Sequence, residues 1–93
     1  MAFFMQTLPF SFQVTRVHRL ARSQVAILDG AIIQGIVRIG QCLALTPAAT
    51  EGIAVRGVVL PLAKEGISLT VYIRHPLLEQ LVAGSVLHAC AEG

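Results

Sequence analysis

Cysteine and histidine side chains offer the most obvious chemistry in this 93-residue chain. His88 and Cys90 are two residues apart, so a strand there would point both side chains to the same face. With Cys42 and either His18 or His75, they have the ligand types of a tetrahedral zinc site. Such sites draw a close pair of ligands from each of two segments, and only one close pair is present. We therefore predict no metal and no cofactor, and we keep a small thiol or metal enzyme as a third alternative.

The two cysteines also bear on the compartment in which the protein works. Disulfide frameworks of small domains use more cysteines and belong to secreted proteins. The chain lacks the basic start and the small-residue cleavage site of a secretory signal. Its longest uncharged run, residues 1–15, contains polar residues and is shorter than the ~18 apolar residues of a spanning helix. We expect reduced thiols in a cytoplasmic protein that makes no membrane contact.

Carboxylates give little support for catalysis. A nucleophilic cysteine needs a base and an orienting partner, and Asp29 and Glu79 are candidates only because acids are few. We interpret them as ordinary turn and surface carboxylates. The five acidic residues are scattered, so no paired-carboxylate site is predicted either. The sequence predicts no catalytic residues and a protein that is not an enzyme.

Arginine supplies six of the seven basic residues and forms the one local concentration of charge. Arg16, Arg19 and Arg22 lie close together in the sequence, and Arg38 is expected on the neighbouring hairpin. These four residues could bind RNA phosphates. Tyr72 is the only aromatic residue after Phe12, so a base-stacking platform has little support. A solvated basic loop is the plainer interpretation.

The elements that must position these residues are short strands. Alternating apolar residues, together with proline and glycine breaks, predict six strands and one helical turn. The strands are expected at residues 10–14, 24–33, 41–46, 53–60, 67–74 and 86–91, with the turn at 77–82. Residues 1–8 form an apolar extension, which we expect to dock on its own barrel or on a second subunit, and residues 9–93 form one domain.

Glycines at positions 30, 35 and 40 recur between β-branched residues. Glycine inside a strand marks a bend or a close approach of backbone. The pattern predicts a tight turn at Arg38-Ile39-Gly40. Because corners of small barrels are made with glycines and bulges, it favours a small, closed, six-stranded antiparallel β-barrel.

The run from Ile32 to Leu45, I-x-x-G-I-V-R-I-G-Q-C-L-A-L, resembles the second-domain β-barrel of translational GTPases such as elongation factor Tu. Pro9-Phe10, Val55-Arg56-Gly57-Val58 and the segment Leu81–Leu87 resemble other parts of that domain in order and spacing. The loops at residues 20–23 and 65–66 depart from the pattern, so the RNA and domain contacts made there are not implied. No G-x-x-x-x-G-K-[ST] motif and no asparagine occur, so the resemblance implies the barrel standing alone, without its GTPase.

Composition suggests how such a barrel is used. Hydrophobic residues make up 55% of the chain and charged residues 13%, with a net charge of +2. So few charges cannot cover the surface, and exposed apolar area usually marks a contact with a partner. Outward positions such as Cys42, Ala44 and Ala54 motivate the main prediction: a non-catalytic module that binds another protein or itself as a homo-oligomer. The alternative is an RNA- or ribosome-binding accessory protein that uses Arg16, Arg19, Arg22 and Arg38.

Overall fold

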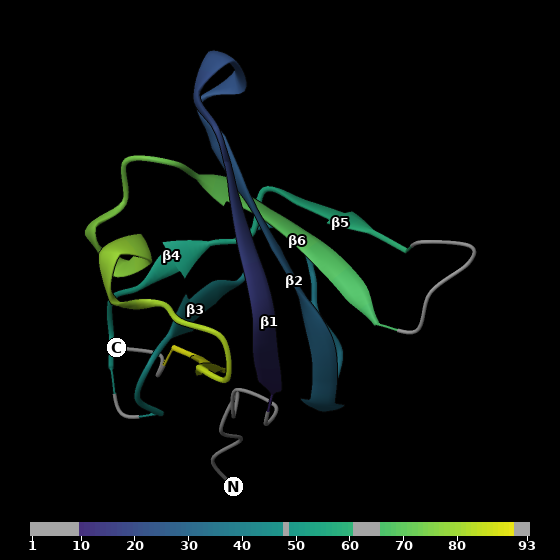
Figure 1. The fold of residues 1–93 in the computed structure, drawn as a ribbon. Coiled ribbons are helices and arrows are strands. Elements are labelled where there is room, and N and C mark those ends of the chain that lie inside the picture. The colour runs from purple at the N-terminus through teal and green to yellow at the C-terminus, as the bar shows by residue number, and fades with distance from the viewer. Residues whose placement is uncertain (1–9, 48, 61–65, 91–93) are drawn as a thin grey trace, which may run out of the picture.

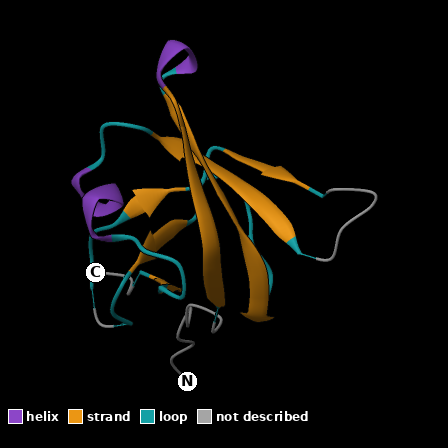
Figure 2. Cartoon of the chain, in the orientation of Figure 1, coloured by secondary structure: helices purple, strands orange, loops and turns teal. Residues whose placement is uncertain are grey.

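The computed structural model describes residues 10–47, 49–60 and 66–90. They form one antiparallel sheet of seven strands, with two short 3-10 helices, η1 and η2 (Figures 1 and 2). The strands are β1 (Ser11–Leu20), β2 (Val25–Gln34), β3 (Cys42–Ala44), β4 (Ile53–Ala54), β5 (Gly57–Val59), β6 (Ile67–Tyr72) and β7 (Val86–Ala89). η1 (Ala21–Ser23) joins β1 to β2, and η2 (Pro76–Gln80) lies between β6 and β7. The predicted extension at residues 1–8 lies outside the described residues.

The sheet has the order β4-β3-β7-β1-β2-β6-β5 and curls into a half-barrel. The predicted all-β class is confirmed, whereas the closed six-stranded barrel is wrong. Among the described strands, no ladder joins β4 to β5, which are the two ends of the sheet. The difference originates in the segment predicted as one strand over residues 53–60.

That segment forms two strands on opposite edges of the sheet. β4 pairs with β3, and β5 pairs with β6. Between them, the N–H of Val55 donates to the Gln41 carbonyl at 2.8 Å, and the N–H of Arg56 donates to the Thr70 carbonyl at 2.7 Å. The backbone thus changes partners within two residues, which local alternation of residue types cannot reveal.

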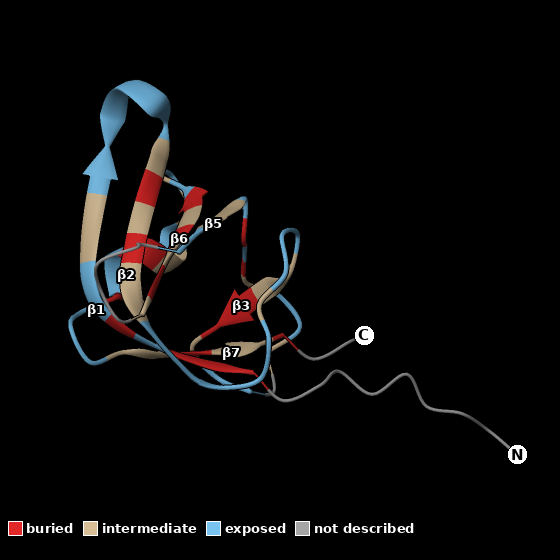
Figure 3. Ribbon diagram, turned by 90° about the vertical axis from the view of Figure 1, so that its right-hand side faces the viewer, coloured by how far each residue is buried: buried red, intermediate tan, exposed pale blue. Residues whose placement is uncertain are grey.

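β1 and β2 form a long hairpin that extends beyond the rest of the sheet, with η1 at its tip (Figure 1). The strand expected at residues 10–14 continues to Leu20, so the arginine-rich stretch is mostly strand rather than loop. β2 also runs without a break through Asp29 and Gly30. Toward the tip the hairpin becomes exposed, as the pale blue end in Figure 3 shows.

Glycines serve two different purposes here. A Cβ at Gly30 would meet the Gln13 carbonyl oxygen and would lie 2.8 Å from the Phe12 ring. The predicted turn at Arg38-Ile39-Gly40 is confirmed, because the N–H of Gln41 donates to the Arg38 carbonyl at 3.1 Å. Gly40 has φ +91°, a backbone conformation that glycine adopts without steric cost.

The core lies on the concave side of the sheet, where every strand except β5 contributes buried side chains. In β6, the predicted alternation is confirmed, since Ile67, Leu69 and Val71 are buried and the residues between them are not. The largest fully buried side chains are Phe12, Val14, Leu28, Leu43, Ile53, Val55, Leu69, Val71, Leu78 and Leu87. Leu78 comes from η2, which overlaps the predicted helical turn and begins after His75, whose Nδ1 accepts from the N–H of Leu77.

Candidate functional site

The convex side of β1, β2 and β6 carries a cluster of polar side chains that no local sequence motif predicts. Asp29 lies at its centre, and its side chain is 37% exposed. Oδ1 accepts a hydrogen bond from Ser68 Oγ at 2.6 Å, and Oδ2 lies 2.9 Å from His18 Nε2. Asp29 aligns with Arg16 on β1 and with Ser68 on β6, and directly opposite residues of paired strands share a face. Asp29 is therefore a strand residue, and the prediction of a turn carboxylate is wrong.

The surroundings of Asp29 favour its charged form. The hydroxyl of Ser68 is the main cause that holds the pKa of Asp29 below its ordinary value. Partial burial opposes this shift, while the hydrogen bond from His18 and the charges of His18 and Arg16 add to it. The carboxylate is thus satisfied within the sheet.

The cluster contains the residue types of a hydrolytic triad in a different arrangement. In a triad, the histidine accepts the proton of the serine and the carboxylate orients the histidine. Here Ser68 and His18 both bind Asp29, one on each carboxylate oxygen. The Ser68 proton is donated to the acid and not to a base, so this geometry orders the face rather than activating a nucleophile.

Tyr72 and Arg56 form a second feature of the same face. Tyr72 follows Ser68 and Thr70 along the outward side of β6 and is 41% exposed. The guanidinium carbon of Arg56 lies 5.8 Å from the centre of the Tyr72 ring, within the range of a cation–π contact. Arg56 is itself exposed. The pair places an aromatic ring and a positive charge side by side at the surface.

The four arginines predicted to bind RNA do not share one face. Arg16 lies opposite Asp29 on the convex side, whereas Arg19 lies opposite buried Ala26 on the concave side. Arg19 Nη2 donates to the Leu78 carbonyl at 3.3 Å, so this guanidinium links the hairpin to η2. The bulge between Val14 and Arg16 changes which residues point outward, a shift that simple alternation misses.

The remaining two arginines lie elsewhere. Arg22 is exposed in η1 at the hairpin tip. Arg38 is exposed in the turn after β2, where its backbone N–H donates to Gln41 Oε1 at 2.9 Å. The fold therefore spreads these four arginines over the two faces of β1, the hairpin tip and a separate turn.

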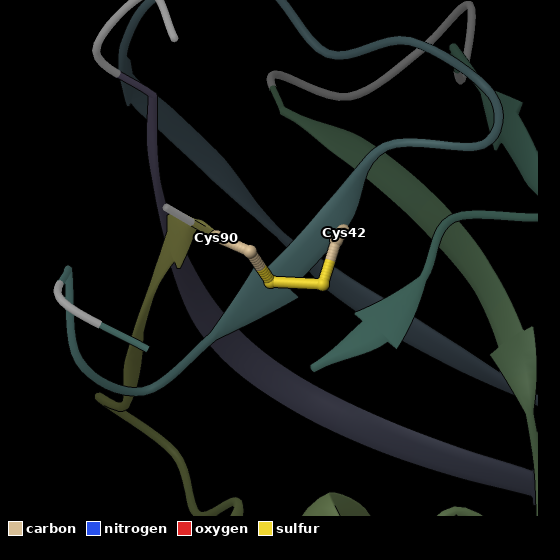
Figure 4. Close-up of a disulfide and its surroundings, with 2 residues drawn as sticks. All are labelled: Cys42 and Cys90. Atoms are coloured by element: carbon tan, nitrogen blue, oxygen red, sulfur yellow. A yellow bond between two sulfur atoms is a disulfide. The ribbon is translucent and has the colours of Figure 1, made fainter. Parts of the chain in front are cut away.

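The cysteines are joined, so the expectation of reduced thiols is wrong for this structure. Cys42 and Cys90 form a disulfide with an S–S distance of 2.05 Å and a Cα–Cα distance of 5.3 Å (Figure 4). The N–H of Cys90 also donates to the Cys42 carbonyl at 2.9 Å. This contact forms because β7 pairs with β3 and Cys90 is the residue after β7. Gly52 leaves room for the bond, since a Cβ there would lie 2.8 Å from Cys90 Sγ.

The three histidines of the hypothetical zinc site lie in separate places. His88 Nδ1 lies 3.4 Å from Ser11 Oγ, His75 caps η2, and His18 contacts Asp29. Within residues 10–47, 49–60 and 66–90, no three histidine, cysteine or acidic side chains are grouped to hold a metal ion. Both candidate thiolates are used in the disulfide.

Of the three apolar positions predicted to face outward, one is exposed and the other two are not. Ala54 is exposed, but Ala44 is 3% exposed and Cys42 is half-buried. The large exposed apolar residues are Leu20, Ile32, Ile33, Ile36, Ile39, Val59, Leu60, Tyr72 and Val82. Four of them are isoleucines within residues 32–39, at the end of β2 and in the following turn.

Sequence reasoning missed the pairing of Ser68, Asp29 and His18 and the contact between Tyr72 and Arg56. The alternation of β6 does give one usable signal, since it places Ser68, Thr70 and Tyr72 on one face. Alternation does not reveal the register between strands, and the register decides which residues of adjacent strands lie beside Ser68, Thr70 and Tyr72.

Comparisons of the chain with protein-family models, curated proteins and solved structures found no match. Among the described elements, no helix has the length and apolar character needed to cross a membrane.

Proposed function

We propose that this protein is a non-catalytic interaction module that associates with itself or with another protein. The observation that carries the proposal is the segment Ile32–Ile39. The side chains of Ile33, Ile36 and Ile39 are 58%, 72% and 70% exposed. The chain has few charged residues, so much of its surface must be apolar. Burying such side chains between two molecules removes apolar area from water, which favours association.

The edge of the sheet next to β6 adds to this argument. β5 is an end strand whose Val59 is 54% exposed, and Leu60, which follows it, is 70% exposed. End strands present unpaired backbone groups and are usually protected by charged residues. Residues 57–60 carry no charge, so this strand itself lacks that protection.

Sedimentation over a wide range of protein concentration tests the self-association. We expect a concentration-dependent increase in mass, and we expect the double variant Ile36→Glu/Ile39→Glu to be monomeric. Both positions are exposed, so the substitutions should leave the fold intact. Val82→Glu is the matched control, because Val82 is 65% exposed on the loop after η2. A wild-type protein that stays monomeric throughout would sink the homo-oligomeric form of the proposal.

The resemblance to the second-domain barrel of translational GTPases stays a proposal about ancestry. The antiparallel curled sheet, the glycine turn at residues 38–40 and the last strand after Gly84 support it. The split of residues 53–60 between two edges and the unclosed sheet separate this chain from a closed barrel of that kind.

RNA binding is the second candidate function. It is favoured by Arg22 at the tip of the protruding hairpin and by exposed Arg16, neither of which makes an ion pair with another described residue. Titration with single-stranded RNA at increasing salt tests it, since binding to phosphates weakens as salt rises. Absence of binding at low salt would remove it.

The cytoplasmic location also stays a prediction. Persistent disulfides belong to oxidising compartments, and cytosolic thiol pools keep most cysteines reduced. The Cys42–Cys90 bond therefore provides a direct test. Alkylation of free thiols in intact cells before lysis should label both cysteines if the protein is cytoplasmic, and neither if it is in an oxidising compartment.

A further inference from the structure

The convex face of β1, β2 and β6 has an unbalanced charge. Arg16 lies on this face, exposed Arg56 stacks over its tyrosine, and exposed Arg74 lies two residues after the end of β6. Asp29 is the one carboxylate that the described strands place on the face, and both of its oxygens are bound by Ser68 and His18. Arg16 lies opposite this carboxylate, so its charge is partly balanced there, whereas Arg56 makes no ion pair with a described residue. The face therefore keeps an excess of positive charge for a partner.

Apolar side chains lie among these charges. Val25 and Ile27 of β2 align with Tyr72 and Thr70 of β6, so they share the convex face, and both are partly exposed. Leu20 aligns with Val25 from the other side and is 44% exposed. The face thus combines a shallow apolar strip with a positively charged border.

Tyr72 and Arg56 are the anchor of this surface. Tyrosine and arginine are the residue types that most often dominate binding energy at protein interfaces. The ring holds the Arg56 guanidinium by a contact of 5.8 Å, and no described carboxylate lies within ion-pair distance of it. A planar guanidinium held in this way presents its N–H groups to a carboxylate in the fork geometry that arginine favours.

We propose that this face binds an acidic segment of a partner protein, with carboxylates on Arg56 and Arg16 and apolar side chains over Val25 and Ile27. Charge complementarity selects an acidic partner, and the apolar strip favours a protein over RNA. Single-stranded nucleic acid is commonly held by stacking its bases on several aromatic side chains, and Tyr72 is the one tyrosine of the chain, which has no tryptophan. The inference rests on the proposed interaction function and assigns it a partner class and a surface.

The absence of other tyrosines and of tryptophan gives the experiment a site-specific signal. Tyrosine fluorescence of this protein comes from Tyr72 alone. We would titrate the full chain with a synthetic peptide of glutamates and leucines that has no aromatic residues. The expected result is a saturable change in Tyr72 fluorescence whose midpoint moves to higher peptide concentration as salt is raised.

Two variants and one control locate the binding. The variants Arg56→Ala and Tyr72→Ala should each weaken peptide binding by roughly tenfold or more, the size expected for a central interface residue. Binding by Tyr72→Ala is measured by calorimetry, because this variant has lost the fluorescent residue. Arg38→Ala removes the same charge from the turn between β2 and β3 and should change the affinity by less than about twofold. Thermal unfolding of each variant shows whether its fold is retained.

Three results would overturn the assignment: no binding at low salt, equal binding by all three variants, or single-stranded RNA that binds this face more tightly than the peptide. Failure of the proposed self-association can be distinguished from failure of peptide binding. If Ile36→Glu/Ile39→Glu abolishes self-association and still binds the peptide, the two surfaces are independent. If the wild type self-associates and does not bind the peptide, only this inference fails.

Discussion

Single residues set the shape of the hairpin and the polarity of its convex face. Gly30 lets β1 approach β2 closely at the bulge, because its missing Cβ leaves space for the Gln13 carbonyl and the Phe12 ring. The neighbouring residue, Asp29, is hydrogen-bonded to Ser68 of β6 and to His18 of β1. One residue therefore determines backbone spacing and the next determines the local charge.

Gly30→Ala should destabilise the protein by about 3 kcal/mol or more, as overpacking against backbone and a buried ring requires both strands to move. Gly84→Ala is the matched control. Gly84 has φ +97° with no atom within 4 Å of an added Cβ, so only backbone strain of about 1 kcal/mol is expected. Urea unfolding measures both. Equal losses of stability would contradict the close approach at Gly30.

Ser68→Ala should reduce stability near pH 6 by about 1 kcal/mol and have little effect near pH 2. The folded-state pKa of Asp29 is lowered. Its contribution to stability is therefore present above the unfolded pKa of about 3.9 and is lost as the pH falls through the folded value. Unfolding curves at both pH values measure the difference.

Thr70→Ala is the control for that experiment. Thr70 lies on the same face of β6 and makes no side-chain hydrogen bond to Asp29. Its effect on stability should be the same at both pH values. A Ser68→Ala effect that is equally independent of pH would show that the hydroxyl does not stabilise the charged carboxylate.

At the scale of elements, the sheet has one strongly paired half and one weakly paired half. β1 and β2 align over nine residue pairs, and β2 and β6 over six. β3 aligns with β7 and with β4 over two pairs each. The Cys42–Cys90 bond lies in the weaker half, where it links the residue after β7 to the first residue of β3.

Reduction of the disulfide should lower the free energy of unfolding by about 4 kcal/mol, the loop-closure value for its sequence separation of 48. Hydrogen exchange should show β3, β4 and β7 losing protection before β1, β2 and β6, because the short strands have few other constraints. Cys42→Ala/Cys90→Ala should match the reduced protein and show no response to reductant. Unchanged unfolding of the wild type after reduction would rule out this role.

The described part of the molecule is a curled sheet, and the chain carries little charge to keep copies apart. Its net charge of +2 gives weak repulsion between two copies, so exposed isoleucines at residues 32–39 meet little electrostatic opposition. The convex face differs, since arginines border its apolar strip and would repel the same face of another copy. This contrast is the reason that we propose self-association through the isoleucine segment and an acidic partner for the convex face.

The sequence by itself determined the strand class and most local breaks. Alternation located residues 67–72, proline and glycine located η2 and the turn at Gly40, and both signals depend only on neighbours along the chain. Only tertiary structure decided the split of residues 53–60, the disulfide, and the opposite faces of Arg16 and Arg19. Each of these depends on cross-strand register and bulges, which are fixed when the curled sheet buries its concave face as a whole.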